Sequence, residues 1–323
     1  MLPDGRRLGV HLPLGGGMVR AVERAHEIGA TALQVFADNP TAWRRRSQPP
    51  KELPAFRQRL TELDIGPLAI HASYLVNLAG PDEDFFAKSV AVLAHELRVA
   101  PAFGARFVNV HVGSHRGSGP GAGTRRVAEG IALVLSEVDA GPEAALLVLE
   151  NSAGSGAGLG TTVEELAAIL DAAAARGVDT ARLAFCLDTA HAWAAGYRIS
   201  EPAETDALLD AFDRQIGLKR LVMIHLNDSR AKLGSKVDRH EHIAAGEIGA
   251  PGLAHILTQP RLATVTYYLE TPGMEDGFDA INIARCHALA AGAPLPELPP
   301  ERAGGPGHGR GGRAGRDAGS SPG

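Results

Sequence analysis

From residue 8 to about residue 290, short apolar runs alternate with longer amphipathic stretches. The short runs have the length of buried strands, and the longer, Ala-rich stretches repeat apolar residues at helical spacing. The expected strands span residues 8–12, 32–37, 67–73, 107–112, 145–151, 183–189, 221–227 and 265–271. Helical patterns fill the intervals, for example at 19–28, 85–100, 127–138, 163–175 and 281–291. Repeated βα units of this kind indicate a parallel sheet covered by helices.

Eight βα units in fewer than 300 residues match a TIM (β/α)8 barrel in count and length. A doubly wound open sheet is the alternative, because periodicity does not show whether the last strand closes on the first. We assign residues 1–290 to the barrel. The segment 291–323 contains ten Gly, six Pro and four Arg with few large apolar side chains, so we expect it to be a disordered tail.

Composition narrows the class of protein. The 32 basic and 37 acidic residues give a net charge of -5, which disfavours a protein that coats nucleic acid nonspecifically. The apolar runs are too short to span a bilayer, and residues 1–20 do not resemble a secretory signal, so we expect a cytoplasmic protein with no membrane partner. Cys186 and Cys286 form no C-x-x-C pair, so a bound metal would need His and carboxylate ligands.

Titratable side chains gather where the expected strands end, and the carboxyl ends of barrel strands open on one face. Strands three to eight and the loop after strand seven supply nine of them: His71, His111, Glu150, Asp188, His191, His225, Asp238, His240 and Glu270. This set suits Zn²⁺ or a similar divalent ion. Three more histidines near this face, His11, His115 and His242, are candidates to orient the ligands through hydrogen bonds.

A single His or Glu at a strand end is more often a hydrogen-bonded structural group than a metal ligand. Nine such groups on one rim need compensating cations, because unpaired buried imidazoles and carboxylates are costly, and bound metal is the simplest source. Local spacing agrees with this interpretation. Asp238 and His240 are two residues apart and point the same way in an extended segment, whereas Asp188 and His191 are three apart across an expected strand-to-loop turn.

The segments that carry these residues resemble the endonuclease IV family of apurinic/apyrimidinic endonucleases. The matching segments are HASYLVNLA at 71–79, HVGSH at 111–115, LENSAG at 149–154, LDTAHAWAAGY at 187–197, HLNDS at 225–229, VDRHEH at 237–242 and LETP at 269–272. They occur in the expected order from about residue 8 to residue 275. The resemblance covers the barrel and excludes the tail.

The resemblance implies a TIM barrel of the xylose isomerase-like type that binds three zinc ions and acts on double-stranded DNA. It implies hydrolysis 5′ to abasic sites, leaving a 3′-hydroxyl and a 5′-deoxyribose phosphate, with trimming of blocked 3′ ends. The implied ligand groups are His71, His111 and Glu150; Glu150, Asp188, His225 and Glu270; and His191, Asp238 and His240. Glu150, which bridges two ions, and Glu270, which orients the nucleophile, are the implied catalytic carboxylates.

DNA recognition is expected from loops on the same face. By resemblance, Tyr74 wedges into the duplex at the lesion, and the loop at 38–46 contacts DNA. Many relatives carry Arg where this chain has Thr41, and we expect Arg44, Arg45 and Arg46 to supply phosphate contacts instead. A second departure is the Ala244-Ala245-Gly246 stretch, where relatives tend to have more Gly. We expect the protein to be a monomer.

Two other classes of function compete with this interpretation. A xylose isomerase-like sugar isomerase or epimerase would share the barrel and a His, Glu and Asp metal site, but it needs one or two ions and no third His and Asp group. A noncatalytic DNA-binding or metal-storage protein is a different class. The acidic net charge disfavours DNA coating, and an open metal cluster disfavours both noncatalytic roles.

Overall fold

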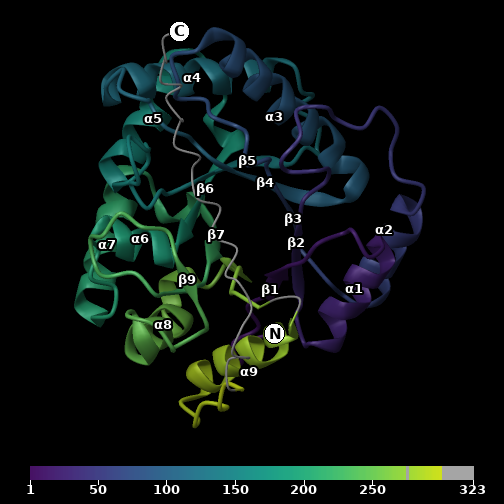
Figure 1. Cartoon of the computed structure of the whole chain (residues 1–323), viewed down its shortest axis with the longest axis vertical. Helices are drawn as coiled ribbons and strands as arrows, with labels where there is room; N and C mark the ends of the chain where they lie inside the picture. Colours follow the sequence, from purple (N-terminus) through teal and green to yellow (C-terminus); the bar gives the residue numbers. More distant parts are fainter. Residues whose placement is uncertain (274–275, 300–323) are drawn as a thin grey trace, which may run out of the picture.

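The computed structural model describes residues 1–273 and 276–299, and its centre is a closed barrel of parallel strands ringed by helices (Figure 1). The barrel strands are β1 (Leu8–His11), β2 (Ala32–Val35), β3 (Leu68–His71), β4 (Ala105–His111), β5 (Leu146–Glu150), β6 (Leu183–Asp188), β7 (Leu221–His225) and β10 (Thr266–Leu269). The last strand pairs with the first, in the register Leu8 to Tyr267. This closure confirms the predicted TIM barrel and excludes the open sheet.

The helices lie outside the barrel and include the five expected from periodicity. They are α1 (Met18–Glu27), α2 (Leu53–Glu62), α3 (Glu83–Phe103), α4 (Pro120–Ser136), α5 (Val163–Ala175), α6 (Thr189–Ala195), α7 (Pro202–Gln215), α8 (Gly249–Thr258) and α9 (Phe278–Ala291). Short 3₁₀ turns precede three strands: η1 (Thr180–Arg182), η2 (Leu218–Arg220) and η3 (Pro260–Leu262). Helix starts follow local chemistry, since the side chain of Thr162 accepts a hydrogen bond from the Glu165 amide and so caps α5.

The interior of the barrel divides into an apolar layer and a polar layer. The apolar layer consists of Ala32, Ala69, Phe107, Val148, Ala184, Cys186, Met223 and Tyr268. Side chains two residues apart on a strand point to the same side. The residues two positions after members of this layer are therefore also directed inward, and they are Gln34, His71, Asn109, Glu150, Asp188, His225 and Glu270. Because side-chain direction alternates along each strand, a ring of inward-facing polar residues lies at the carboxyl end of the barrel, beyond the apolar layer.

The loop after β7 carries a small antiparallel pair, β8 (Asp228–Ser229) and β9 (His240–Glu241), in which Ser229 lies opposite His240. Asp228 anchors the segment that follows, because its carboxylate accepts hydrogen bonds from the Gly246 and Ile248 amides at 3.0 and 2.9 Å. A Cβ at Gly246 would lie 2.4 Å from the Ser229 carbonyl oxygen, so this position requires glycine. The pair holds the loop against the barrel mouth.

The boundary of the barrel lies further along the chain than the predicted residue 290. Helix α9 ends at Ala291, Leu295 packs against the core, and the Arg285 guanidinium donates to the Pro296 carbonyl. The stretch 291–296 therefore belongs with the barrel, contrary to the prediction that it is disordered. The predicted tail from residue 300 onward lies outside the described residues. Over the part of the chain that the structure describes, no helix is both long and apolar enough to cross a bilayer.

Candidate metal centre

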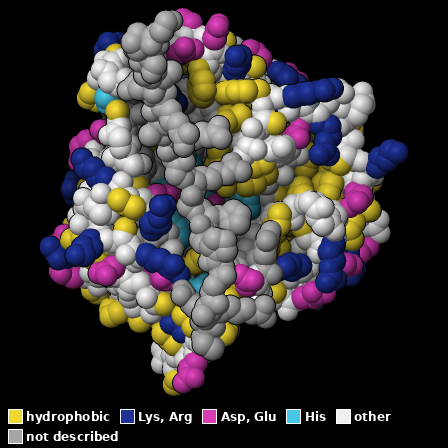
Figure 2. Space-filling view, viewed as in Figure 1, with side chains coloured by type: hydrophobic (Ala, Val, Ile, Leu, Met, Phe, Trp, Pro, Cys, Tyr) yellow, Lys and Arg dark blue, Asp and Glu magenta, His cyan; other side chains and the backbone are white. Residues whose placement is uncertain are grey.

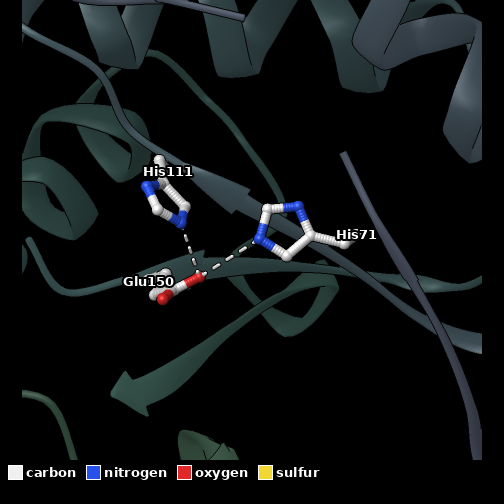
Figure 3. Close-up of side chains that lie close together, drawn as sticks. All are labelled: His71, His111 and Glu150. Atoms are coloured by element: carbon white, nitrogen blue, oxygen red, sulfur yellow. Dashed lines mark ion pairs between the residues drawn. The ribbon is translucent and has the colours of Figure 1, made fainter. Parts of the chain in front are cut away.

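The first group of predicted ligands joins the ends of β3, β4 and β5 (Figure 3). Glu150 Oε2 lies 3.8 Å from His71 Nε2 and 3.2 Å from His111 Nε2. Glu150 and His71 are buried, and His111 is partly exposed toward the barrel mouth. One carboxylate oxygen and two imidazole nitrogens therefore face a common point, as the ligands of one ion would.

The second group shares Glu150 with the first and lies deeper in the barrel. Its members are Glu150, Asp188, His225 and Glu270, whose ligand atoms all lie within 4.8 Å of one another. His225 Nδ1 is 3.2 Å from Glu150 Oε1, 3.4 Å from Glu270 Oε2 and 4.0 Å from Asp188 Oδ2. The group has three carboxylates around one ring nitrogen, an arrangement that favours a divalent cation.

The third group brings together a helix and the loop after β7. Asp238 oxygens lie 3.3 Å from His191 Nε2 and 3.2 Å from His240 Nε2. His191 is on α6, so the expected strand-to-loop turn is in fact a strand-to-helix turn. The physical reason is that the Asp188 side chain accepts from the His191 amide at 2.8 Å and caps the helix. The side chain of Asp238 is 48% exposed, which places this group nearest to solvent.

Hydrogen bonds hold the ligand rings in defined orientations. The Nδ1 atoms of His71, His191 and His240 lie 2.8, 2.9 and 3.0 Å from the carbonyl oxygens of Ala72, Asn151 and Glu270. A carbonyl only accepts, so each Nδ1 carries the proton and each Nε2 of a neutral ring presents a lone pair to its group. Among the described residues, the buried Nε2 of His240 makes no hydrogen bond. These features fit metal ligands.

Three buried amide side chains support the carboxylates, and the sequence interpretation missed all three. Asn109 donates to Glu150 Oε2 at 2.5 Å, Asn227 donates to Asp188 Oδ2 at 2.8 Å, and Gln34 donates to Glu270 Oε1 at 2.7 Å. Asn109 and Gln34 interrupt strands that are otherwise largely apolar, and this was the available signal. Each bond fixes one carboxylate oxygen and leaves the other oxygen for a second partner.

Burial and neighbouring charges set the pKa values of the ligand side chains. Burial opposes ionisation of Glu150, but the His111 and His225 rings outweigh it and hold its pKa well below the usual range. Burial likewise opposes the charged form of His240, yet Asp188 and Asp238 raise its pKa to about 9. Burial dominates at His71 and lowers its pKa to about 4. Glu150 is therefore ionised and requires nearby positive charge, which protons or metal ions can supply.

Cys186 is the one thiol close to these ligands in the described chain, and its sulfur lies within 4.8 Å of ligand atoms of Glu150 and His225. Burial raises the pKa of this thiol to about 11. A protonated thiol is a poor metal ligand.

The three histidines expected to orient ligands have different partners. His11 Nδ1 lies 3.2 Å from Glu270 Oε1, as expected for an orienting group. His115 Nδ1 instead accepts from the Gly117 and Gly119 amides at 3.2 and 3.1 Å and shapes the loop after β4. His242 pairs with Asn282 and stacks on Phe278, which ties the loop after β7 to α9. For His115 and His242, the structure thus shows contacts that organise loops.

A cavity of about 300 Å³ lies above the cluster and is lined by ligands and by Tyr74. Tyr74 is 66% exposed, and its ring contacts Phe36 edge-to-face with centroids 5.0 Å apart. A second cavity of about 610 Å³, which includes Arg46 and Lys51, shares Pro13 and Phe36 with the first. Figure 2 shows histidine side chains near the middle of this face with Lys and Arg side chains around them. Two adjoining cavities therefore lie on the face that carries the ligand groups.

The arginines of the loop after β2 do not behave alike. Arg44 and Arg46 are exposed. Arg45 is turned inward: its side chain is 8% exposed, its Nη1 lies 3.6 Å from Glu96 Oε1, and it donates to the Asn39 carbonyl at 3.1 Å. The expected phosphate contact of Arg45 is therefore not supported, because a buried carboxylate and loop carbonyls hold its guanidinium. Thr41 donates to the Asn39 side chain at 2.9 Å.

Comparisons with known proteins agree with this geometry. A family described as the xylose isomerase-like TIM barrel matches residues 22–289. A protein of Methanoculleus marisnigri named "Probable endonuclease 4" is 41% identical over 284 residues, covering 88% of this chain and 98% of its own length. The crystal structure of endonuclease IV from Thermus thermophilus is 41% identical, with a TM-score of 0.76, covering 89% of this chain and all of that chain (100%).

The barrel alone is shared more widely. A D-psicose 3-epimerase from Clostridium cellulolyticum is 14% identical with a TM-score of 0.59, covering 81% of this chain and 84% of that chain. At that identity the likeness shows the fold and does not support the isomerase or epimerase alternative. The endonuclease relatives match at much higher identity over nearly the whole barrel. The chain therefore belongs to the endonuclease IV family, a group of DNA-repair nucleases built on the xylose isomerase-like barrel.

Proposed function

We propose that this chain is a zinc-dependent endonuclease that hydrolyses the phosphodiester 5′ to an abasic site in double-stranded DNA. The products would be a 3′-hydroxyl and a 5′-deoxyribose phosphate, and the same site would trim blocked 3′ ends. One observation carries the proposal: nine side chains form three adjacent groups, linked through Glu150 and Asp188, beneath an open mouth. A monomeric state and a cytoplasmic location are further predictions of this proposal.

We divide these residues among three ions by their contacts, and both Asp188 and Asp238 lie near the histidines of the third group. His71, His111 and Glu150 would hold the first ion; Glu150, Asp188, His225 and Glu270 the second; and His191, Asp238 and His240 the third. Bound zinc ions would supply an activated water and neutralise charge on the phosphate and the leaving oxygen. Zinc suits the mixture of imidazole and carboxylate ligands.

Glu270 would orient the attacking water. Its Oε1 accepts from Gln34, its amide nitrogen donates to Asn227 Oδ1 at 2.9 Å, and its side chain is 17% exposed to the mouth. One bond holds the main chain of Glu270 and the other holds its carboxylate, so an oxygen facing the cavity can accept a proton of the water at a defined position. Glu150 is fully enclosed and would act through its contacts with His111 and His225.

Tyr74 and the two exposed arginines would recognise the lesion and its phosphates. An abasic site lacks one base in the stack, so inserting an aromatic side chain there costs less than at an intact pair. Tyr74 is exposed but backed by Phe36 and His71, with ring centroids 5.0 and 6.0 Å away, so it is a braced wedge. Arg44 and Arg46 would bind backbone phosphates on the same face.

The test is incision of a duplex with one tetrahydrofuran abasic analogue, which cannot break by β-elimination. We expect cleavage on the 5′ side of the analogue, loss of activity with a chelator, and recovery on adding zinc. Extension of the product by a DNA polymerase would confirm the 3′-hydroxyl, and a duplex with a 3′-phosphate would test trimming. An intact duplex of the same sequence is the control. Absence of incision, or incision insensitive to the chelator, would refute the proposal.

A further inference from the structure

Gln34 is a fully buried amide in the polar ring of the barrel. It lies on β2, two residues after Ala32 of the apolar layer and opposite His11 of β1 in the strand register. Its Nε2 is 2.7 Å from Glu270 Oε1 and 3.1 Å from His11 Nδ1, and its Oε1 is 3.0 Å from His225 Nε2. Gln34 therefore contacts a carboxylate and an imidazole of the same ligand group.

The chemistry of these partners determines which way the amide points. An ionised carboxylate only accepts hydrogen bonds, so the group facing Glu270 must be the NH₂ of Gln34 and the group facing His225 must be its carbonyl. A carbonyl also only accepts, so His225 Nε2 must carry a proton. In the neutral ring, the lone pair of His225 is then at Nδ1, which faces Glu150 and Glu270 at 3.2 and 3.4 Å.

His225 is the exception among the ligand rings with a defined partner. His71, His191 and His240 each donate Nδ1–H to a backbone carbonyl and present Nε2. His225 presents Nδ1, and the acceptor that sets this choice is a side chain rather than the backbone. A single substitution can therefore remove the partner of His225 without altering the main chain.

The side-chain NH₂ groups of the other two supporting amides each donate to one ligand only. Asn109 donates to Glu150, and Asn227 donates through its side chain to Asp188. Gln34 alone among these three bonds both a carboxylate and an imidazole of one group within the described chain. Without Gln34, the buried Nε2–H of His225 would have lost the Gln34 acceptor. A flipped ring, or the tautomer with its proton on Nδ1, would then be favoured, because that proton could be donated to Glu150 or Glu270.

We propose that Gln34 is a positioning residue that sets the tautomer of His225 and the orientation of Glu270, so that the second ligand group binds its zinc ion tightly. The inference rests on the proposed zinc-dependent function and adds to it a residue that contacts no metal. Hydrogen-bond partners of metal ligands change metal affinity by about 10–100-fold when they are removed. We therefore expect a loss of that size at one of three zinc sites.

The experiment compares two variants of Gln34 with a matched control. Gln34→Leu removes the hydrogen bonds to Glu270, His11 and His225 and introduces an apolar side chain of similar length. Gln34→Glu retains an acceptor for His225 Nε2 but places a second carboxylate beside Glu270. Gln259→Leu removes another buried glutamine amide, which donates to Asp206 at 2.7 Å and lies outside the ligand groups. The full chain is used throughout, and thermal melting checks that each variant folds.

Two readouts are independent of incision. Zinc stoichiometry and affinity are measured by elemental analysis and by competition with a chromophoric chelator. The tautomer of His225 is read by NMR of the zinc-loaded protein labelled with ¹⁵N-histidine, its signal being assigned by its absence in His225→Gln. Gln34→Leu should weaken the binding of one zinc ion by about 10–100-fold. Its spectrum should lack the His225 Nε2–H signal. Gln34→Glu should keep that signal, and Gln259→Leu should match the wild type in both readouts.

Wild-type zinc affinity together with an unchanged His225 signal in Gln34→Leu would overturn the inference, as would loss of the signal in Gln34→Glu. If Gln34→Leu does not fold, the signal in Gln34→Glu decides. The experiment distinguishes failure of this inference from failure of the proposed function. Wild-type protein that binds three zinc ions but does not incise abasic DNA would refute the function only, whereas an incising wild type with an unaffected Gln34→Leu would refute the inference only.

Discussion

The guanidinium of Arg45 lies 3.6 Å from the carboxylate of Glu96, and both side chains are buried, at 8% and 3% exposure. Glu96 Oε1 also accepts from the Ser73 amide at 3.3 Å, and the Ser73 hydroxyl donates to the Pro40 carbonyl at 2.7 Å. Glu96 on α3 therefore joins the loop after β2 to the loop after β3. Tyr74, the exposed neighbour of Ser73, projects from the junction of these two loops.

Substitutions of the three arginines in the loop after β2 should have two kinds of effect, one on stability and one on DNA binding. Arg45→Leu should lower the free energy of unfolding by about 2 kcal/mol, because it removes the guanidinium that lies beside the buried Glu96 carboxyl and donates to the Asn39 carbonyl. Replacing Arg44 and Arg46 with Ser should change stability by less than about 0.5 kcal/mol but weaken duplex binding and reduce the salt slope by about 2. Urea unfolding and binding titrations at two salt concentrations check this. Equal stability effects for the two variants would contradict it.

Glu96 should make the stability of the chain depend on pH. Burial raises the pKa of Glu96 to about 8, with Arg45 offsetting part of the rise. Its pKa in the unfolded chain is about 4.3. Between these values the folded state holds a proton that the unfolded state has lost, so the contribution of Glu96 is complete below the lower value and falls as pH rises to about 8.

Glu96→Gln should remove that dependence. The free energy of unfolding of metal-free variant protein should decline less between pH 5 and pH 8 than that of the wild type, because glutamine does not titrate. Urea unfolding at intervals across this range measures it. Glu204→Gln on the exposed face of α7 is the control and should follow the wild type. Parallel curves for wild type and Glu96→Gln would show that Glu96 is ionised throughout.

Glu270→Gln should abolish incision while leaving DNA binding nearly intact. The substitution removes a charge from the second ligand group and the acceptor for a proton of the attacking water, but it does not touch Tyr74 or the arginine loop. We expect the incision rate to fall on the order of 10³-fold. Single-turnover incision and gel-shift titrations on the same abasic duplex measure the two effects. Collapse of binding together with incision would indicate a structural role.

Tyr74→Ala should lower the preference for abasic over intact duplex by about tenfold, since one stacking contact contributes about 1–3 kcal/mol. Overall affinity should fall less, because phosphate contacts remain. Tyr74→Phe is the matched control and should retain the preference, as the ring and not the hydroxyl fills the gap. Binding titrations on matched duplexes provide the comparison, and an unchanged preference in Tyr74→Ala would remove this residue from lesion recognition.

Removal of metal should lower the melting temperature. A ligand that binds the folded state alone stabilises it, and metal-free protein has four carboxylates and five imidazoles of the ligand groups packed without their ions. Elemental analysis of carefully purified protein should give three zinc ions per chain, and a chelator should lower the melting temperature by several degrees until zinc is added. One ion per chain, with no effect of zinc on melting, would favour an isomerase-like centre.

The sequence alone determined the eight βα units and the set of candidate ligands, whereas the closure of the sheet into a barrel was decided by the structure. Strand and helix periodicities are local properties, and their order places every strand end on one face, so residues such as His71, Glu150 and His225 could be grouped without coordinates. The predicted strands extended one or two residues beyond the observed carboxyl end of each barrel strand, for example at Ala72 and Ser73 after β3. At these positions the chain leaves the strands and forms loops. The pattern of apolar and polar residues does not mark that boundary.

Only the tertiary structure decided which polar side chains support the ligands and which arginines face solvent. Gln34 and Glu270 are 236 residues apart, and Arg45 and Glu96 come from a loop and a helix that sequence order does not place in contact. Identical local patterns left Arg44, Arg45 and Arg46 equivalent until Glu96 attracted one of them inward. Hydrogen bonds and ion pairs of buried groups act over about 3–4 Å, so they depend on barrel closure and loop packing, which local sequence does not encode.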